Sequence, residues 1–237
     1  MSYTREEYVY LSRLNEKAEK YLEMFKCINK FIELDPKLNK EERNILGSGY
    51  KNIISDKRAS LRLITNLEKK NIFQNIYIKE IKEKIEKELS QILAEIQKYL
   101  DKYLIPNALD IENKVFYLKL KADFLRYKCE ISYGKELEEL ITKTEKIYKE
   151  TTDIANKELM ISNSTRLGLA LNYSVFYYEI KKMKEEAINI AKNAFDEAMK
   201  IIDNLEISKA KDTLLIIQML KENLISWCTE INNEFES

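Results

Sequence analysis

The sequence predicts an all-α protein, and three observations support that prediction. Apolar residues recur at three- and four-residue steps along most of the 237 residues. Apolar residues make up 45% of the chain and charged residues 34%, which favours amphipathic helices. Only 4 Gly and 2 Pro occur, too few for the many turns of a β protein. We expect a single domain, residues 1–232, of about nine antiparallel helices forming a concave groove, with 233–237 as a short C-terminal tail.

Start and stop signals place the individual helices. The signals are capping boxes at Thr4 with Glu7 and at Asn39 with Glu42, a cap cluster at 162–165, proline stops at Pro36 and Pro106, and a glycine stop at Gly134. The expected helices cover residues 4–18, 18–34, 39–71, 76–105, 108–133, 135–160, 166–181, 184–203 and 208–232. A short loop near 71–75 reverses the chain between two of the longest helices.

Composition excludes several classes of function. The chain has no histidine, which removes the usual general base and most zinc sites. Lys+Arg and Asp+Glu both number 40, unlike a general nucleic-acid binder. Three separated cysteines without a CxxC motif fit a reducing cytosol, and each is expected to be a small buried apolar residue. With neither a leader nor an apolar run long enough to span a membrane, we expect no membrane partner. From the residue types and charge balance above, we expect no catalytic residue, no metal site, no cofactor and no nucleic-acid partner.

One helix carries an ordered set of cations. Arg58 and Arg62 lie seven and eleven residues after Lys51, so all three project within roughly 20° on a helix that turns about 100° per residue. Apolar side chains about a quarter to a half turn away on the same helix form its expected core face: Tyr50, Ile53, Ile54, Leu61 and Ile64. A solvated charged face is the simplest interpretation of the cations; a second basic cluster favours an anion site.

That second cluster consists of Lys119, Lys121, Arg126 and Tyr127. Asp123 and Glu130, three residues before and four after Arg126, can orient its guanidinium and partly neutralise it. If this helix packs antiparallel to the first, Arg58 and Arg126 converge with Lys51. Two guanidiniums, an ammonium and a phenol suit a phosphate dianion, because arginine binds it bidentately and lysine adds charge.

Two later helices combine amides with aliphatic residues. The first helix presents Leu171, Asn172, Val175 and Glu179, and the last presents Ile216, Met219 and Asn223. An amide both donates and accepts, so it can bind the main chain of an extended peptide while aliphatic residues contact its side chains. An ordinary amphipathic helix with a stray asparagine is the alternative.

Several segments resemble the 14-3-3 family, in order and without large gaps from about Thr4 to Trp227. They are EERNILGSGYKNI (41–53), LIPNA (104–108), KVFYLKLKADFLRY (114–127), RLGLALNYSVFYYEI (166–180), FDEAMK (195–200) and LLIIQMLKENLISW (214–227). The resemblance implies a dimeric helical adaptor without catalysis that binds phosphoserine or phosphothreonine in client proteins. A helical scaffold whose groove no longer discriminates phosphate is the alternative.

The resemblance also implies residue roles. The phosphate would bind Lys51, Arg58, Arg126 and Tyr127, and the peptide main chain would bind Asn172 and Asn223. The apolar wall of the groove would consist of Leu171, Val175, Ile216 and Met219. Further residues near the groove would be Glu179, Trp227, Arg62, Lys119 and Lys121. Departures from the family pattern are GSG at 47–49, Asp56 with Lys57, Ser226, a shorter loop at 71–75 and few residues after Trp227. Of these, Ser226 and the altered segment at 55–57 could weaken peptide binding. The few residues after Trp227 leave little of the acidic tail that can compete with a ligand for the basic groove.

A dimer is expected through the first two helices, about residues 1–34, of one subunit and the third and fourth of the other. The matching positions are Leu14, Ala18 and Ile81, with Lys20–Glu88 and Glu23–Lys84 as pairs of opposite charge between subunits. Exposed pairs of this kind contribute about 0–1 kcal/mol each, so they set register more than strength. We expect a homodimer, leaving a heterodimer open, and a cytoplasmic location, leaving the nucleus open.

Overall fold

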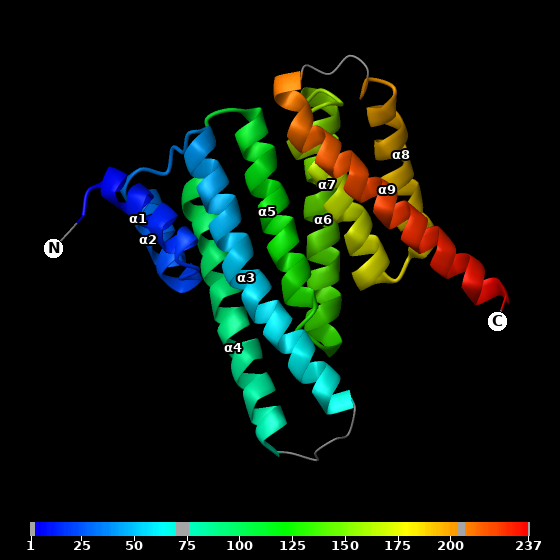
Figure 1. The fold of residues 1–237 in the computed structure, drawn as a ribbon, viewed down its shortest axis with the longest axis horizontal. Coiled ribbons are helices and arrows are strands. Elements are labelled where there is room, and N and C mark those ends of the chain that lie inside the picture. The colour runs from blue at the N-terminus through cyan, green and yellow to red at the C-terminus, as the bar shows by residue number, and fades with distance from the viewer. Residues whose placement is uncertain (1–2, 70–75, 203–206, 237) are drawn as a thin grey trace. The chain divides into compact units, whose positions relative to one another are not determined.

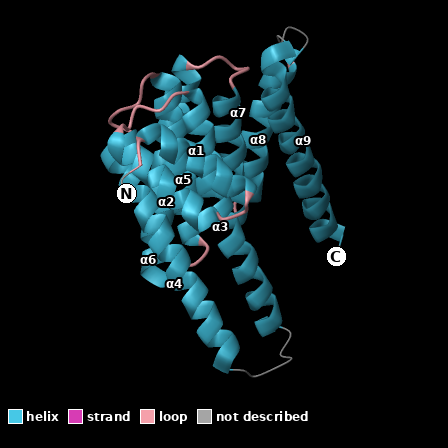
Figure 2. Ribbon diagram, turned by 60° about the vertical axis from the view of Figure 1, so that its left-hand side comes forward, coloured by secondary structure: helices cyan, strands magenta, loops and turns pink. Residues whose placement is uncertain are grey.

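The computed structural model describes residues 3–69, 76–202 and 207–236. Over these residues the chain consists of helices and connecting loops, without a β-strand (Figure 2), which confirms the all-α prediction. None of the described helices combines the length and apolar character needed to cross a membrane. The chain divides into two compact units, residues 1–109 and 110–237, which are described in turn. The short loop expected at 71–75 lies outside the described residues.

The first unit is a four-helix arrangement. Its helices are α1 (Arg5–Lys17), α2 (Tyr21–Leu34), α3 (Lys40–Lys69) and α4 (Ile76–Tyr99), followed by a π-helical turn (Leu100–Leu104). The long helices α3 and α4 lie side by side, and α1 and α2 pack against the N-terminal part of α3 (Figure 1). The π-helical turn runs directly from α4 toward Pro106, so the predicted long helix and its break are both confirmed.

Local capping sets the starts of two of these helices. The Thr4 hydroxyl accepts a hydrogen bond from the Glu7 backbone N–H at 3.2 Å, and the Glu7 carboxylate accepts one from the Thr4 N–H at 2.7 Å. At the start of α3, Asn39 accepts from the Glu42 N–H at 3.0 Å, and Glu42 accepts from the Asn39 N–H at 2.9 Å. Both predicted capping boxes are confirmed.

The apolar face of α3 is buried as its periodicity predicts. Tyr50, Ile53 and Ile54 are at most 3% exposed, while Leu61 and Ile64 are half-buried. The core therefore holds the first half of α3 more firmly than its second half.

The second unit contains the remaining helices. They are α5 (Ile111–Cys129), α6 (Gly134–Glu158), α7 (Ser164–Val175) with a π-helical extension (Phe176–Lys181), α8 (Lys184–Met199) and α9 (Ile207–Glu236). Helix α5 packs against α6, α7 against α8, and α9 lies against both α7 and α8 (Figure 1). A central cluster of α5, α6 and α7 contains Val115, Ala122, Tyr148, Leu169 and Phe176, each at most 1% exposed.

Three predicted helix ends were wrong. Helix α8 ends at Met199 rather than 203. Helix α5 ends at Cys129 rather than 133, and Gly134 starts α6 instead of terminating α5, although its φ of +56° does use the left-handed conformation that glycine tolerates. Helix α9 continues to Glu236, past the expected end at 232 and through most of the expected tail, because neither glycine nor proline interrupts it.

Candidate functional site

The cationic stripe of α3 lies about a quarter to a half turn from its buried face. Lys51 and Arg62 are exposed, and Arg58 is half-buried. This arrangement matches the predicted projection of the three cations on one side of a helix. Arg126 belongs to the other unit, so its convergence with Lys51 and Arg58 stays a prediction.

Lys57, one of the departures from the family pattern, has a defined partner. Its Nζ atom lies 2.7 Å from Oε2 of Glu88 on α4, and this contact lowers the pKa of the Glu88 carboxyl. Lys57 thus ties α3 to α4 beside Arg58. The pair also engages within the subunit a carboxylate that we expected to pair across a dimer.

Arg126 is a buried cation with carboxylates on two sides. Its side chain is 6% exposed, and its Nη1 atom lies 3.8 Å from Glu130 and 3.7 Å from Glu179, both beyond hydrogen-bond length. Its guanidinium carbon lies 4.5 Å from the centre of the Tyr127 ring. Burial lowers the pKa of Arg126, but the combined effect of Tyr148, Tyr127 and Asp123 is larger and raises the net pKa above its ordinary value. The guanidinium therefore stays charged.

The Nε–H of Arg126 is buried and has no hydrogen-bond partner within the described parts of the chain. A buried donor without a partner costs about 1–3 kcal/mol, and more when the group is charged. The two carboxylates lie too far away to hydrogen-bond the Nη1 atom, and the Nε–H has no partner in the described chain. An anionic ligand could therefore form hydrogen bonds with this guanidinium.

Asp123 acts on Arg126 through its charge, which helps to raise the pKa of the guanidinium, in line with the expected partial neutralisation. Its hydrogen bonds go elsewhere: the carboxylate accepts from Tyr148 at 2.6 Å and from Lys119 and Asn172 at 2.8 Å each. The structure thus brings two predicted binding residues, Lys119 and Asn172, onto one carboxylate. Glu130 does contact Arg126, as expected.

The apolar residues expected along the peptide form one cluster of α7, α8 and α9. Leu171 and Trp227 are buried at 6% and 7%, and Val175 and Ile216 pack against them half-buried. Met219 is 44% exposed. Asn223 is half-buried on α9, one turn after Met219. The wall thus has a buried base and an exposed edge.

Trp227 anchors α9 from the core side. Its ring stacks on Tyr178 of the π-helical extension, with centroids 4.4 Å apart and planes 10° apart. Nearby, Lys184 of α8 pairs with Glu230 of α9 at 2.8 Å. Its burial in the cluster of α7, α8 and α9 packs α9 against the core, and its expected place near a groove stays a prediction. Tyr178 and Tyr148 were missed by sequence reasoning, because tyrosines are frequent here and only tertiary contacts single these two out.

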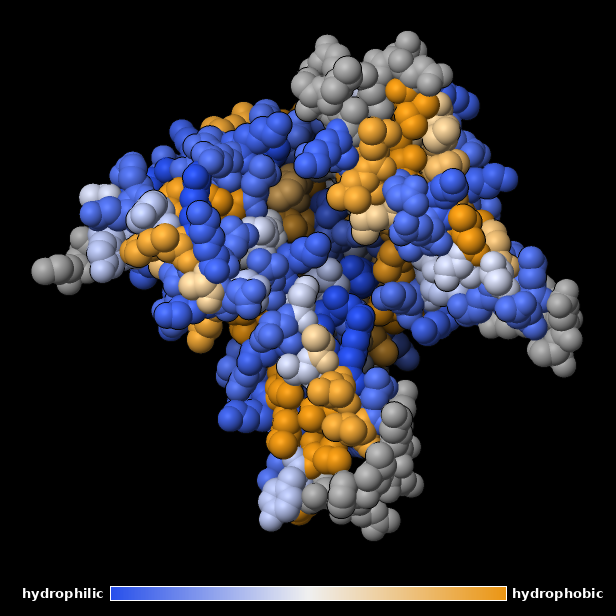
Figure 3. Space-filling model, in the orientation of Figure 1, coloured by the Kyte–Doolittle hydropathy of each residue, from blue (hydrophilic) through white to orange (hydrophobic). Residues whose placement is uncertain are grey.

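The residues expected at a dimer contact are mainly on the surface of the first unit. Leu14 is 43% and Ile81 48% exposed, and these other members are exposed as well: Ala18, Lys20, Glu23 and Lys84. Glu88 is half-buried through Lys57, and Glu23 pairs with Lys26 at 2.8 Å. Figure 3 shows apolar side chains gathered near the far end of the α3–α4 hairpin, and the exposed apolar residues of these two helices include Leu63, Leu67 and Ile76 as well as Ile81.

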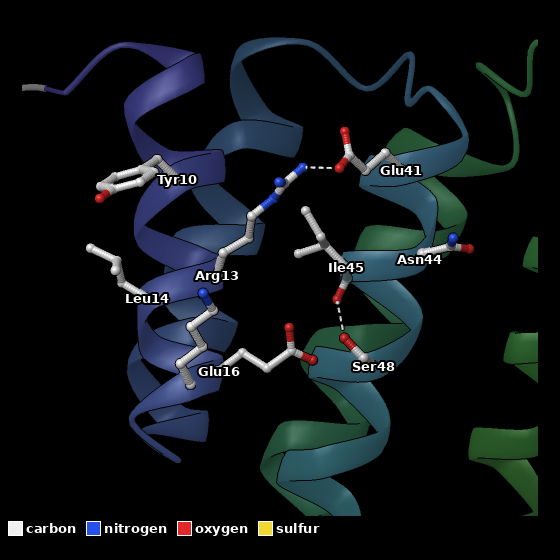
Figure 4. Close-up of a pocket in the computed structure, with 9 residues that line it drawn as sticks. Tyr10, Arg13, Leu14, Glu16, Glu41, Asn44, Ile45 and Ser48 are labelled. Carbon is white, nitrogen blue, oxygen red and sulfur yellow. Dashed lines mark hydrogen bonds and ion pairs between the residues drawn. The ribbon is translucent and has the colours of Figure 1, made fainter.

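A shallow hollow separates α1 from α3. Tyr10 and Leu14 line it from α1, Ile45 and Ser48 line it from α3, and an ion pair from Arg13 to Glu41 spans it (Figure 4). Leu14, an expected dimer residue, therefore projects beside an open surface where another chain could contact it.

The remaining candidates for reactive or metal-binding groups are acidic clusters and the three cysteines. The described residues include no cluster of three or more His, Cys, Asp or Glu suited to a metal ion. Cys27, Cys129 and Cys228 are all free, and Cys228 is exposed, which contradicts the expectation that each cysteine is buried. Burial raises the pKa of the Cys129 thiol.

The described residues form an all-α fold that displays basic and amide side chains on its helices. The chain belongs to the 14-3-3 family: the family's model, described as 14-3-3 protein, matches residues 11–228. The chain is 42% identical to 14-3-3-like protein D of Nicotiana tabacum over 240 residues, covering 98% of this chain and 96% of that one.

Two further relatives extend the comparison to vertebrates and fungi. The 14-3-3 protein beta/alpha of Xenopus tropicalis is 41% identical over 97% of this chain and 96% of its own length. The checkpoint signal transducer rad25 of Schizosaccharomyces pombe is 45% identical over 97% of this chain and 87% of its own length.

Proposed function

We propose that this protein is a phosphoserine- and phosphothreonine-peptide-binding adaptor that acts as a dimer and has no catalytic activity. The observation that carries the proposal is Arg126: a buried, permanently charged guanidinium beside Tyr148. The Nε–H of Arg126 has no hydrogen-bond partner among the described residues, and its two carboxylate neighbours lie beyond hydrogen-bond length. Membership of a family whose relatives include a signal transducer supports the same role.

A phosphate monoester fits this guanidinium better than its present neighbours do. It brings about −1.5 to −2 charges and three acceptor oxygens, which can bond the guanidinium directly at about 2.7–2.9 Å. Tyr127 adds a phenol beside it. In the proposed complex, Lys51 and Arg58 of the first unit complete the phosphate site, and Arg62 and Lys119 contribute outside it.

The peptide on either side of the phosphate would contact α7 and α9. Asn172 and Asn223 would bind its main chain, because each amide offers both a donor and an acceptor. Val175, Ile216 and the exposed Met219 would contact its side chains, with Leu171 as their buried support. Glu179 would contact basic residues of the client near the phosphate.

We further propose a dimer through the exposed apolar residues of the first unit, among them Leu14 and Ile81. A dimer would present two phosphate sites and could bind two phosphorylated segments of one client, raising the effective concentration of the second. A homodimer is the simplest form, and a heterodimer would use the same surface. Three free cysteines fit a reducing, cytoplasmic compartment.

The test is a fluorescence-anisotropy titration of one basic peptide with and without phosphoserine. We expect the phosphorylated form to bind at least tenfold more tightly. Arg126→Ala should weaken binding about 10- to 100-fold, since a hydrogen bond to a charged group contributes about 1.5–3 kcal/mol. Lys51→Glu should do the same, whereas Lys135→Glu, the same charge change at an 88% exposed residue of α6, should have no effect.

A scaffold that ignores phosphate is the competing function. Its signature would be equal affinity for both peptides and no response to Lys51→Glu or Arg126→Ala. Lys57 and Ser226, which depart from the family pattern, are the features that favour this alternative.

A further inference from the structure

Asp123 is the most completely hydrogen-bonded buried charge in the described part of the second unit. It is 4% exposed on α5 and joins three helices. Its Oδ1 atom accepts from the Tyr148 hydroxyl of α6 at 2.6 Å. Its Oδ2 atom accepts from the Lys119 ammonium at 2.8 Å and from the Asn172 amide of α7 at 2.8 Å.

All three neighbours of this carboxylate act as donors. Burial and the Asp123 charge raise the pKa of Tyr148 well above its ordinary value, so its hydroxyl keeps its proton. Lys119 has only donors. Therefore the group at position 123 must supply acceptors alone, which an ionised carboxylate does and an amide does not.

This requirement fixes the orientation of the Asn172 amide. Because Asp123 can only accept, the NH₂ side of Asn172 must face it, and the carbonyl side must point elsewhere. One N–H of Asn172 is used by Asp123, which leaves the carbonyl oxygen and the second N–H for a ligand. An amide without this contact could flip by 180° and exchange its donor and acceptor.

We propose that Asp123 is a positioning residue for peptide binding: it locks the Asn172 amide so that its carbonyl accepts from a main-chain N–H of the ligand, and it holds Lys119 beside the same site. This inference rests on the proposed function. Because the Lys119 ammonium is fixed against Asp123 and partly neutralised by it, Lys119 should attract phosphate less strongly than the exposed Lys51 does.

The test is a double-mutant cycle on phosphopeptide affinity. Asp123→Asn and Asn172→Ala should each weaken binding about 3- to 10-fold, the range of one or two neutral hydrogen bonds. In the Asn172→Ala background, Asp123→Asn should change affinity less than twofold, because its main target is gone and the partly neutralised Lys119, the partner that remains, contributes little. Independent, multiplying effects in the double variant would overturn the inference.

Glu145 supplies a matched control for the charge change. Like Asp123, it accepts from a tyrosine and a lysine, Tyr177 at 2.6 Å and Lys181 at 2.5 Å, but no hydrogen bond joins it to Asn172. Glu145→Gln should lower the melting temperature and leave affinity unchanged. An equal loss of affinity in Glu145→Gln would show that Asp123 acts only through general stability, and would overturn its positioning role.

A measurement that leaves Asp123 unaltered keeps the inference testable if Asp123→Asn does not fold. Peptides carrying an ester in place of a single amide next to the phosphoserine lack one N–H donor each. One such ester should bind about 3- to 10-fold more weakly, and Asn172→Ala should abolish that difference. If no ester weakens binding, the carbonyl orientation is wrong. If the wild type ignores phosphate in the same assay, the proposed function fails instead.

Discussion

Replacing Gly49 with alanine tests how closely α2 and α3 are packed. Gly49 is buried in the middle of α3. A Cβ atom built there would overlap Cδ1 of Ile28 and lie 3.1 Å from Cε of Met24, and both of these α2 residues are 0% exposed. The substitution thus sets a gain in helix propensity against a steric cost.

The two terms can be weighed. Alanine is favoured over glycine in a helix interior by about 1 kcal/mol. Forcing an extra methyl group into a packed core costs about 1–3 kcal/mol. We therefore expect Gly49→Ala to destabilise the protein by about 1 kcal/mol, a fall in melting temperature of about 2–4 °C for a chain of this size.

Ile28→Val provides the decisive background, because it removes the Cδ1 atom that the new methyl group meets. Alone it should cost about 0.5–1.5 kcal/mol. The approach to Cε of Met24 that remains involves the flexible end of a side chain, so in this background Gly49→Ala should become stabilising, by up to about 1 kcal/mol. Urea midpoints of the four proteins give the sign in each background. A stabilising Gly49→Ala in the wild type, or the same effect in both backgrounds, would refute the reasoning.

Three further changes have defined outcomes. Lys182 has a φ of +61°, so Lys182→Gly should raise stability by about 0.5–1 kcal/mol in urea unfolding, while Lys182→Ala, which keeps the Cβ atom, should not. Burial raises the pKa of the Glu42 carboxyl, but the hydrogen bond from Arg5, the hydrogen bond from the Asn39 N–H and the charge of Arg5 together outweigh it, and the net pKa is lowered. The ionised Glu42 carboxylate therefore stabilises the fold fully above the ordinary carboxyl pKa of about 4.3, and this stabilisation is lost as the pH falls through the lower pKa of the folded state. Glu42→Gln should have a smaller free energy of unfolding than the wild type at pH 7, and the difference should shrink below about pH 4. A difference that does not change with pH would contradict this. Tyr178→Ala should shift the emission of Trp227, the single tryptophan, to longer wavelength, because the stacked indole loses its cover; unchanged emission would argue against the stack.

Features set by local sequence were predictable. The capping boxes at Thr4 and Asn39 and the buried face of α3 at Tyr50, Ile53 and Ile54 follow from spacing within a few residues, where helix geometry leaves little freedom. The misplaced end at Gly134 shows the limit of such signals, because a glycine marks a left-handed residue without saying which element it adjoins.

Features set by contacts between helices were not predictable. Sequence spacing put Asp123 within reach of Arg126, yet it bonds Tyr148 and Asn172, which lie 25 and 49 residues away. Several donors compete for one buried carboxylate, and only the packing of α5, α6 and α7 decides among them. The exposure of Cys228 is also a property of how α9 docks, not of its own sequence.

The most direct measurement is a crystal structure of the protein with a bound phosphoserine peptide. The account predicts phosphate oxygens within hydrogen-bond distance of the guanidiniums of both Arg58 and Arg126 and of the Lys51 ammonium. A phosphate bound elsewhere, or contacting Arg126 while Arg58 and Lys51 stay remote from it, would contradict the account.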